Sequence, residues 1–140
     1  MHKVELDKFQ GPLDLLLYFI RRDELDINDI PIAEITAEYL QIIEDMKAMN
    51  LSVAGEFILM AATLMRIKSK MLIPRAELDD LGEPIDPRTE LVKQLIEYKK
   101  YKDIADNLSE KWERLSYQHE RSISETFEDL DADNSGYLKE

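Results

Sequence analysis

The chain contains no cysteine, only four glycines and no long run of apolar residues. Without cysteine, disulfide scaffolds, thiolate metal sites and thiol nucleophiles are excluded. The glycines are spaced too widely for a phosphate-binding loop. The longest uncharged apolar stretch, residues 57–65, falls short of the roughly 20 residues of a membrane span, and the first residues lack the apolar stretch of a signal peptide. We therefore expect a soluble, cytoplasmic protein.

The charge balance is strongly acidic. There are 18 Lys and Arg residues against 30 Asp and Glu residues, which gives a formal net charge of −12. Because such a surface repels phosphate backbones, we expect contact with DNA to be indirect. Apolar residues make up 44% of the 140 residues, enough for a hydrophobic core. The length suits one compact domain or two small helical modules joined by a linker.

Apolar residues recur at helical spacing along most of the chain, so the predicted fold class is all-α. Amphipathic helices are expected over residues 13–22, 32–49, about 52–72 and 88–115. Asn50 and Ser52 are candidate N-caps for the third helix. Asp86, followed by Pro87, has the residue pattern of an N-cap for the fourth.

The chain is expected to divide into four parts. Residues 1–74 form an N-terminal helical domain, and the acidic, proline-containing stretch 75–87 is an exposed linker. Residues 88–120 form a central helical segment. The acidic tail, 121–140, has few apolar residues and is expected to be flexible.

The third predicted helix carries more apolar surface than a one-sided helix needs, because its apolar residues fall on two neighbouring seams. The first seam comprises Phe57, Met60, Leu64, Ile67 and Met71, and the second comprises Ile58, Ala62, Met65 and Leu72. Two interpretations stay open. Either the other helices cover both seams, as in an ordinary bundle, or one seam remains for a partner protein.

The fourth predicted helix also carries apolar residues at three- and four-residue spacing, with an interruption at Lys102. Its apolar set is Leu91, Leu95, Tyr98, Ala105, Leu108, Trp112 and Leu115. An isolated helix is marginally stable in water, and Tyr and Trp are frequent interface anchors. The helix is therefore predicted to bind a partner, with folding back onto the first three helices, or a homo-oligomeric bundle, as alternatives. We interpret the basic run Lys99, Lys100 and Lys102 as a solvated face.

Several ordered motifs resemble a known family. They are residues 9–17 (FQGPLDLLL), 25–27 (LDI), 30–36 (IPIAEIT), 56–64 (EFILMAATL) and 67–74 (IKSKMLIP), together with Tyr39 and Leu40. This combination resembles bacterial segregation and condensation protein A, the kleisin subunit of the SMC condensin-like complex. The resemblance covers about residues 5–120 and is looser after residue 90.

The resemblance implies a non-enzymatic adaptor in chromosome condensation and partition during cell division, cytoplasmic and associated with the nucleoid. In this family the third helix packs against the coiled-coil neck of an SMC ATPase, so the first seam is the predicted docking face. A central segment binds a dimer of segregation and condensation protein B. The predicted anchors for that partner are Leu91, Leu95, Tyr98, Tyr101, Leu108 and Trp112. The family's C-terminal winged-helix domain is expected to lie outside these residues.

No residue pattern predicts catalysis or a cofactor. His2 and His119 lack the spacing of a zinc site, and no nucleophile elbow is present. A competing motif at the end of the chain resembles the beginning of an EF-hand calcium loop, with Asp131, Asp133 and Ser135 as oxygen donors. The given residues do not include the twelfth loop position, which an EF-hand fills with a bidentate glutamate. A small calcium-binding helical protein is therefore the alternative function and not the main prediction.

Overall fold

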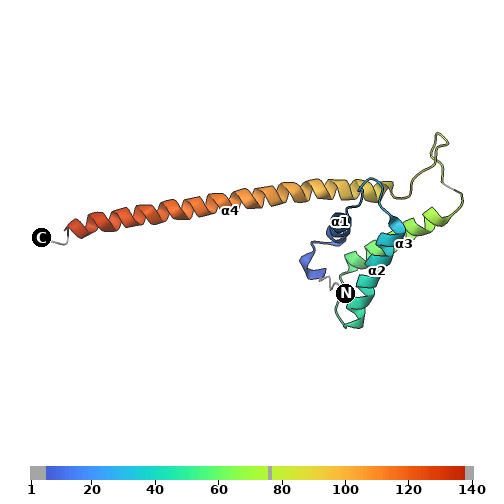
Figure 1. The fold of residues 1–140 in the computed structure, drawn as a ribbon, viewed down its shortest axis with the longest axis horizontal. Coiled ribbons are helices and arrows are strands. Elements are labelled where there is room, and N and C mark those ends of the chain that lie inside the picture. The colour runs from blue at the N-terminus through green and yellow to red at the C-terminus, as the bar shows by residue number, and fades with distance from the viewer. Residues whose placement is uncertain (1–5, 76, 138–140) are drawn as a thin grey trace. The chain divides into compact units, whose positions relative to one another are not determined.

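The computed structural model describes residues 6–75 and 77–137, with side chains up to residue 123 except residue 122. A short 3-10 turn, η1 (Leu6–Lys8), precedes α1 (Pro12–Arg22), α2 (Ile32–Ala48), α3 (Gly55–Leu72) and α4 (Thr89–Tyr137), as Figure 1 shows. In this described range the only β pairing is an isolated bridge between Leu78 and Pro84. The predicted all-α class is confirmed.

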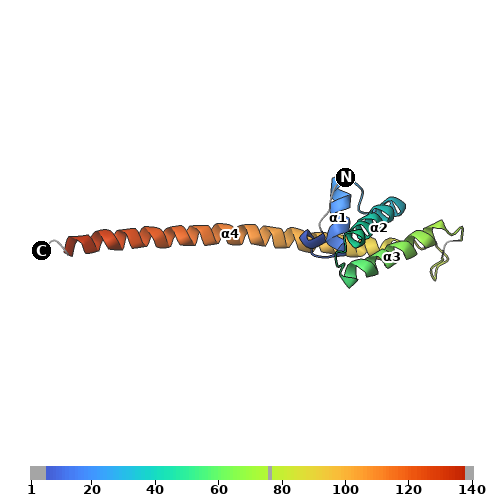
Figure 2. The same ribbon diagram turned by 90° about the horizontal axis from the view of Figure 1, so that it is seen from below.

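The chain divides into two compact units, Met1–Lys99 and Lys100–Glu140. In the first unit, α1, α2 and α3 pack on one another (Figure 2). The division falls within α4, whereas the sequence predicted the end of the N-terminal domain at residue 74. The first turns of α4 thus belong to the same unit as α1, α2 and α3.

The core of the first unit combines residues from all four helices. Its buried apolar side chains include Leu15, Leu16, Leu17 and Phe19 of α1, Ile32, Ile35, Tyr39 and Ile43 of α2, Phe57, Met60, Leu64 and Ile67 of α3, and Leu91 and Leu95 of α4. The buried Tyr39 hydroxyl donates a hydrogen bond of 2.7 Å to the Phe57 carbonyl oxygen, which joins α2 to the start of α3. Burial raises the pKa of Tyr39, so this hydroxyl keeps its proton.

The start of α1 explains the Gly-Pro-Leu-Asp motif. Gly11 has φ 140° and ψ 180°, a conformation that residues with a Cβ rarely adopt. Pro12 occupies the first helical position, where its missing N–H is not needed. The Asp14 carboxylate reaches back and accepts a hydrogen bond of 3.1 Å from the Gln10 backbone N–H. Gly11, Pro12 and Asp14 therefore each serve the turn into α1.

Asn50 ends α2 and does not cap α3, which corrects one expectation. Asn50 has φ 56°, and the Leu51 N–H donates to the Met46 carbonyl while the Asn50 N–H donates to the Lys47 carbonyl. This is the Schellman arrangement, in which asparagine tolerates the left-handed conformation. Ser52 is likewise not the cap, because α3 begins at Gly55 and no side chain caps it.

The entry into α4 is held by Asp86 and Arg88. The Asp86 carboxylate accepts the Arg88 backbone N–H at 2.9 Å, as the predicted N-cap should. The Arg88 guanidinium donates to the Ile30 carbonyl at 2.7 Å and pairs with Asp29 at 2.8 Å. It also pairs with Asp86 at 2.9 Å. These contacts tie the start of α4 to the connection between α1 and α2.

The tail predicted to be flexible is helical as far as Tyr137, because α4 continues through residues 121–137. The physical reason is that residues 89–135 contain neither proline nor glycine, the residues that most disfavour a helix. The prediction gave weight to the loss of apolar periodicity, which reports packing and not backbone propensity. Residues 138–140 of the tail lie outside the described residues.

Candidate protein-binding surfaces

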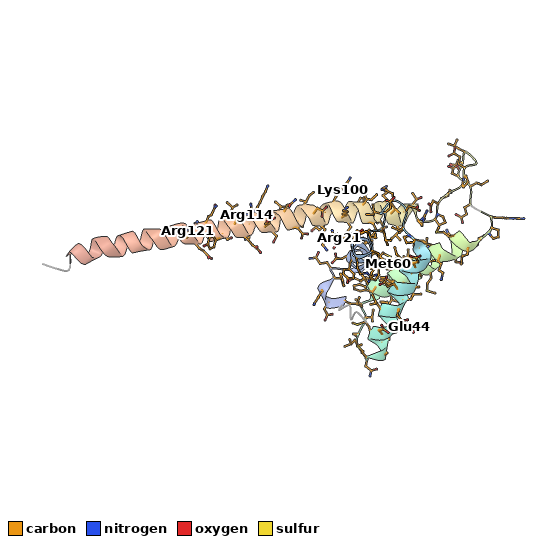
Figure 3. All side chains as sticks on the ribbon, in the orientation of Figure 1. Arg21, Glu44, Met60, Lys100, Arg114 and Arg121 are labelled. Atoms are coloured by element: carbon orange, nitrogen blue, oxygen red, sulfur yellow. The ribbon has the colours of Figure 1, made fainter. Side chains whose placement is uncertain are left out.

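The first seam of α3 faces the core of the first unit. Phe57, Met60, Leu64 and Ile67 are buried against α1, α2 and the start of α4, and Met60 lies among the side chains of the bundle in Figure 3. Met71, in the last turn, is the exposed member. The sequence-based choice of this seam as the docking face is therefore corrected, because four of its side chains already complete the core.

The second seam of α3 is exposed. Ile58, Met65 and Leu72 expose 47%, 52% and 72% of their surface. They stand seven residues apart, and Ala62 and Ser69 lie between them on the same side of the helix. Spacing of seven residues is typical of a helix that packs lengthwise against another helix. We call Ile58, Ala62, Met65, Ser69 and Leu72 the α3 seam.

A third side of α3 lines a groove of about 660 Å³ in the first unit. Its α3 wall consists of Glu56, Leu59, Thr63, Arg66 and Lys70, and its opposite wall consists of Glu90, Gln94 and Tyr98 of α4. Gly11, Pro12 and Leu13 close one part of the groove. Leu59 leaves 70% of its surface exposed there. The sequence analysis did not single out this side of α3.

The predicted anchors on α4 separate into two groups. Leu91 and Leu95 are buried in the core of the first unit, and Tyr98 is half-buried against it. These residues are not free to anchor a partner, and the alternative that the fourth helix folds back holds for its first turns. Tyr101, Leu108 and Trp112 are exposed.

The exposed anchors form one continuous surface of α4 in the second unit. Tyr101, Ile104, Leu108, Trp112 and Leu115 follow at three- and four-residue spacing, and each exposes between 60% and 71% of its surface. We call these five residues the α4 stripe. Ile104 was missed in the sequence because the predicted set passed through Ala105, the adjacent position. Tyr117, which is equally exposed, lies on the opposite side of the helix.

Charged residues flank the α4 stripe on both sides. At about 100° per residue, Lys102 and Glu113 fall on one flank, and Lys100 and Lys111 fall on the other. Arg114 projects from α4 beside the second flank (Figure 3) and pairs with Glu110 one turn earlier, at 3.1 Å. The surface therefore has an apolar centre and a charged rim, the usual anatomy of a protein interface.

The predicted linker is exposed but locally ordered. The Asp79 carboxylate accepts hydrogen bonds of 2.9 Å from the backbone N–H groups of Leu81 and Glu83. The Ile85 N–H donates to the Glu77 carbonyl at 2.8 Å, and Gly82 supplies the positive φ of 79° that the turn requires. Leu81, in this turn, exposes 86% of its surface.

The sequence is similar to a family of known proteins. Residues 19–134 match the family model described as segregation and condensation protein ScpA. The chain belongs to this family. Curated relatives named segregation and condensation protein A are 54% identical over 113 residues in Oceanobacillus iheyensis, covering 79% of this chain and 45% of that protein. The relative in Bacillus subtilis is 46% identical over 143 residues, covering 99% of this chain and 54% of that protein.

A third segregation and condensation protein A, from Brevibacillus brevis, is 53% identical over 116 residues, which cover 78% of this chain and 46% of the relative. The chain thus spans about half the length of the curated relatives it matches. The family model includes α2, α3 and most of α4, so it covers both the α3 seam and the α4 stripe.

The calcium alternative finds no support in this family or in the backbone. Residues 131–137 are part of the helix α4, whereas an EF-hand site needs Asp131, Asp133 and Ser135 in a loop that turns around the ion. Within the described side chains, no three His, Cys, Asp or Glu residues gather as a metal site would require. None of the helices in the described part of the chain combines the length and apolar character of a membrane span.

Proposed function

We propose that this chain is a non-enzymatic adaptor that links an SMC ATPase to segregation and condensation protein B in chromosome condensation and segregation. Membership of the segregation and condensation protein A family supports the process. The observation that carries the adaptor role is that each of the two units leaves one apolar helix surface exposed. Soluble proteins rarely expose such surfaces unless they bind a partner. Two separate surfaces suit a protein that holds two partners.

The α3 seam is the proposed contact with the coiled-coil neck of the SMC ATPase. The seven-residue spacing of Ile58, Met65 and Leu72 matches the repeat of a coiled coil, so the seam can follow a neck helix over its full length. The small residues Ala62 and Ser69 between them allow the two helices to approach closely. This replaces the buried first seam as the docking face.

The α4 stripe is the proposed contact with the dimer of segregation and condensation protein B. Tyr101 and Trp112 are the side-chain types that most often dominate binding energy.

Binding of the SMC neck tests the seam. We expect Met65→Glu to abolish binding to a purified SMC head-and-neck fragment, measured by calorimetry, because it places a charge in the middle of the apolar contact. Met49→Glu is the matched control, since Met49 is equally exposed, at 51%, but lies at the end of α2. If Met65→Glu binds as well as the control, the α3 seam is not the docking face.

Binding of segregation and condensation protein B tests the stripe in the same way. Trp112→Glu is expected to eliminate co-elution with the dimer on a sizing column, while Tyr117→Glu, on the opposite side of α4, leaves it intact. Loss of co-elution with both variants, or with neither, would contradict the assignment.

The proposed adaptor acts in the cytoplasm at the nucleoid, and it reaches DNA through the complex. Its net charge of −12 opposes direct binding to a phosphate backbone. In the assembled complex the ATP chemistry belongs to the SMC subunit, and this chain contributes positioning.

A further inference from the structure

The groove in the first unit is open and polarised. Along its α3 wall the charge changes from acidic at Glu56 to basic at Arg66 and Lys70, and Leu59 lies exposed between these ends. Glu90, on the α4 wall, lies at the basic end, because it lines a second, adjoining cavity together with Lys70. An occupant of this groove therefore needs apolar side chains and a basic group for Glu56 at one end. At the other end it needs an acidic group for Arg66 and Lys70 and a basic group for Glu90.

We propose that the groove binds the α4 stripe of a second copy of this chain. The α3 wall runs from Glu56 to Lys70 and the stripe from Tyr101 to Leu115, which is the same number of residues. At 1.5 Å per residue both are about 21 Å long. The stripe supplies an amphipathic helix, and a groove between helices is a common receptor for one.

The charges on one flank of the stripe match the α3 wall. When the stripe lies parallel to α3, Lys102 comes to the Glu56 end and Glu113 comes to the end with Arg66 and Lys70. The antiparallel orientation would place like charges together at both ends. Charge complementarity therefore selects the parallel orientation.

The other flank of the stripe matches the α4 wall. An α-helix is right-handed, so successive residues advance clockwise when the helix is viewed from its N-terminus. Once the stripe faces the groove in the parallel orientation, this handedness decides which flank faces α3 and which faces α4. In the parallel orientation the flank with Lys102 and Glu113 faces α3, and the flank with Lys111 and Arg114 faces Glu90. The same orientation thus satisfies both walls.

The contact makes self-association and partner binding exclusive. The α4 stripe is also the proposed surface for segregation and condensation protein B, so, on that proposed function, the dimer of this partner displaces the second copy. The self-association itself does not depend on the proposed function, because it is measured on the chain alone.

Sedimentation velocity over a range of micromolar concentrations tests the contact. We expect the average mass of the chain to rise with concentration, and Leu59→Glu in the groove and Trp112→Glu in the stripe each to weaken association at least about tenfold. Leu81→Glu, an equally drastic change at the exposed turn, is the control that should associate like the unchanged chain. A single monomeric species at every concentration, or equal weakening by the control, would overturn the proposal.

Mixing the two variants distinguishes a stripe in a groove from a pair of stripes. The Leu59→Glu chain keeps an intact stripe and the Trp112→Glu chain keeps an intact groove, so their mixture should associate more tightly than either variant alone. Arg66→Glu is expected to weaken association, and adding Glu113→Arg to the same chain should restore it. Failure of the mixture to associate, or failure of this charge reversal, would overturn the contact even if the chain self-associates by another surface.

Discussion

Leucines of one helix have opposite environments in the two units. Leu91 and Leu95 expose 3% and 0% of their surface in the first unit, whereas Leu108 and Leu115 both expose 61% in the second. Both pairs have helical spacing, so neither residue type nor periodicity separates them. The difference is that the first unit offers α1, α2 and α3 to pack against, while the described part of the second unit consists of α4 alone.

The comparison shows two uses of apolar helical surface. In the first unit it stabilises a folded domain, since a buried leucine contributes about 1.5–3 kcal/mol. In the second unit the apolar surface of α4 is exposed, so it contributes little to folding. A helix without such burial is only marginally stable in water. The contribution of this surface becomes available only when another surface covers it, which is why we propose the α4 stripe as an interface.

Truncating one buried and one exposed leucine of α4 should give the largest difference in the free energy of unfolding. We expect Leu95→Ala to lower the free energy of unfolding of the first unit by about 2–5 kcal/mol, because it opens a cavity in a closed core. Leu108→Ala should change that free energy by no more than about 0.5 kcal/mol. Urea unfolding followed by the near-ultraviolet signal of the tyrosines measures both. Equal losses would mean that the two stretches of α4 do not differ in this way.

Removing the Arg88 side chain at the start of α4 should have the next largest effect on the stability of the first unit. Arg88→Ala deletes a side chain that is 16% exposed and donates to the Ile30 carbonyl and to Asp29. Loss of these charge-assisted hydrogen bonds should lower the free energy of unfolding of the first unit by about 1–3 kcal/mol. Lys93→Ala, an exposed position on the same helix, is the control. If hydrogen exchange of residues 91–98 is equal in both variants, Arg88 does not hold α4 in place.

Much of the fold follows from the sequence. Spacing of three and four residues predicts four helices, and Gly11-Pro12 and Asp86-Pro87 mark two of their starts. The start of α3 could not be predicted from Asn50, because asparagine is favoured both before a helix and just after one. Here the left-handed conformation of Asn50 ends α2.

The orientation of α3 could not be predicted from α3 alone. Both of its seams are apolar, and which one is buried depends on where α1, α2 and α4 lie. The seven-residue spacing of Ile58, Met65 and Leu72 was visible, but it distinguishes the seams only once the core is known. The groove was missed for a similar reason, because its walls come from segments far apart in the sequence.

The two environments within α4 did leave a signal in the sequence. Continuing the spacing of Leu91, Leu95 and Tyr98 leads to Lys102, whereas the α4 stripe begins at Tyr101. The interruption at Lys102 therefore marks a change in the side of the helix that is apolar. It occurs close to Lys99, where the first unit ends.

A change of pH should have the smallest effect of these on the free energy of unfolding of the first unit. The Arg88 guanidinium, through its side-chain hydrogen bonds, holds the pKa of Asp86 below its ordinary value of 3.8. A carboxyl group whose pKa is lowered by folding binds fewer protons in the folded state than in the unfolded state. Its contribution to stability is therefore complete above that ordinary value and is lost as the pH falls through the lower value of the folded state.

The variant Asp86→Asn isolates this contribution, because asparagine can still accept the Arg88 backbone N–H but carries no charge. The Asp86 side chain is 47% exposed, so solvent screens the pair, and we expect a difference of only about 0.2–1 kcal/mol between the two chains near pH 7. At pH 2 the difference should be smaller, since protonation of Asp86, which removes its charge in the unchanged chain as well, is favoured as the pH falls. Urea midpoints of the first unit at both pH values measure it. A difference that grows on acidification would show that Asp86 does not stabilise the start of α4 through its charge, and that the buried stretch depends on Leu91 and Leu95 alone.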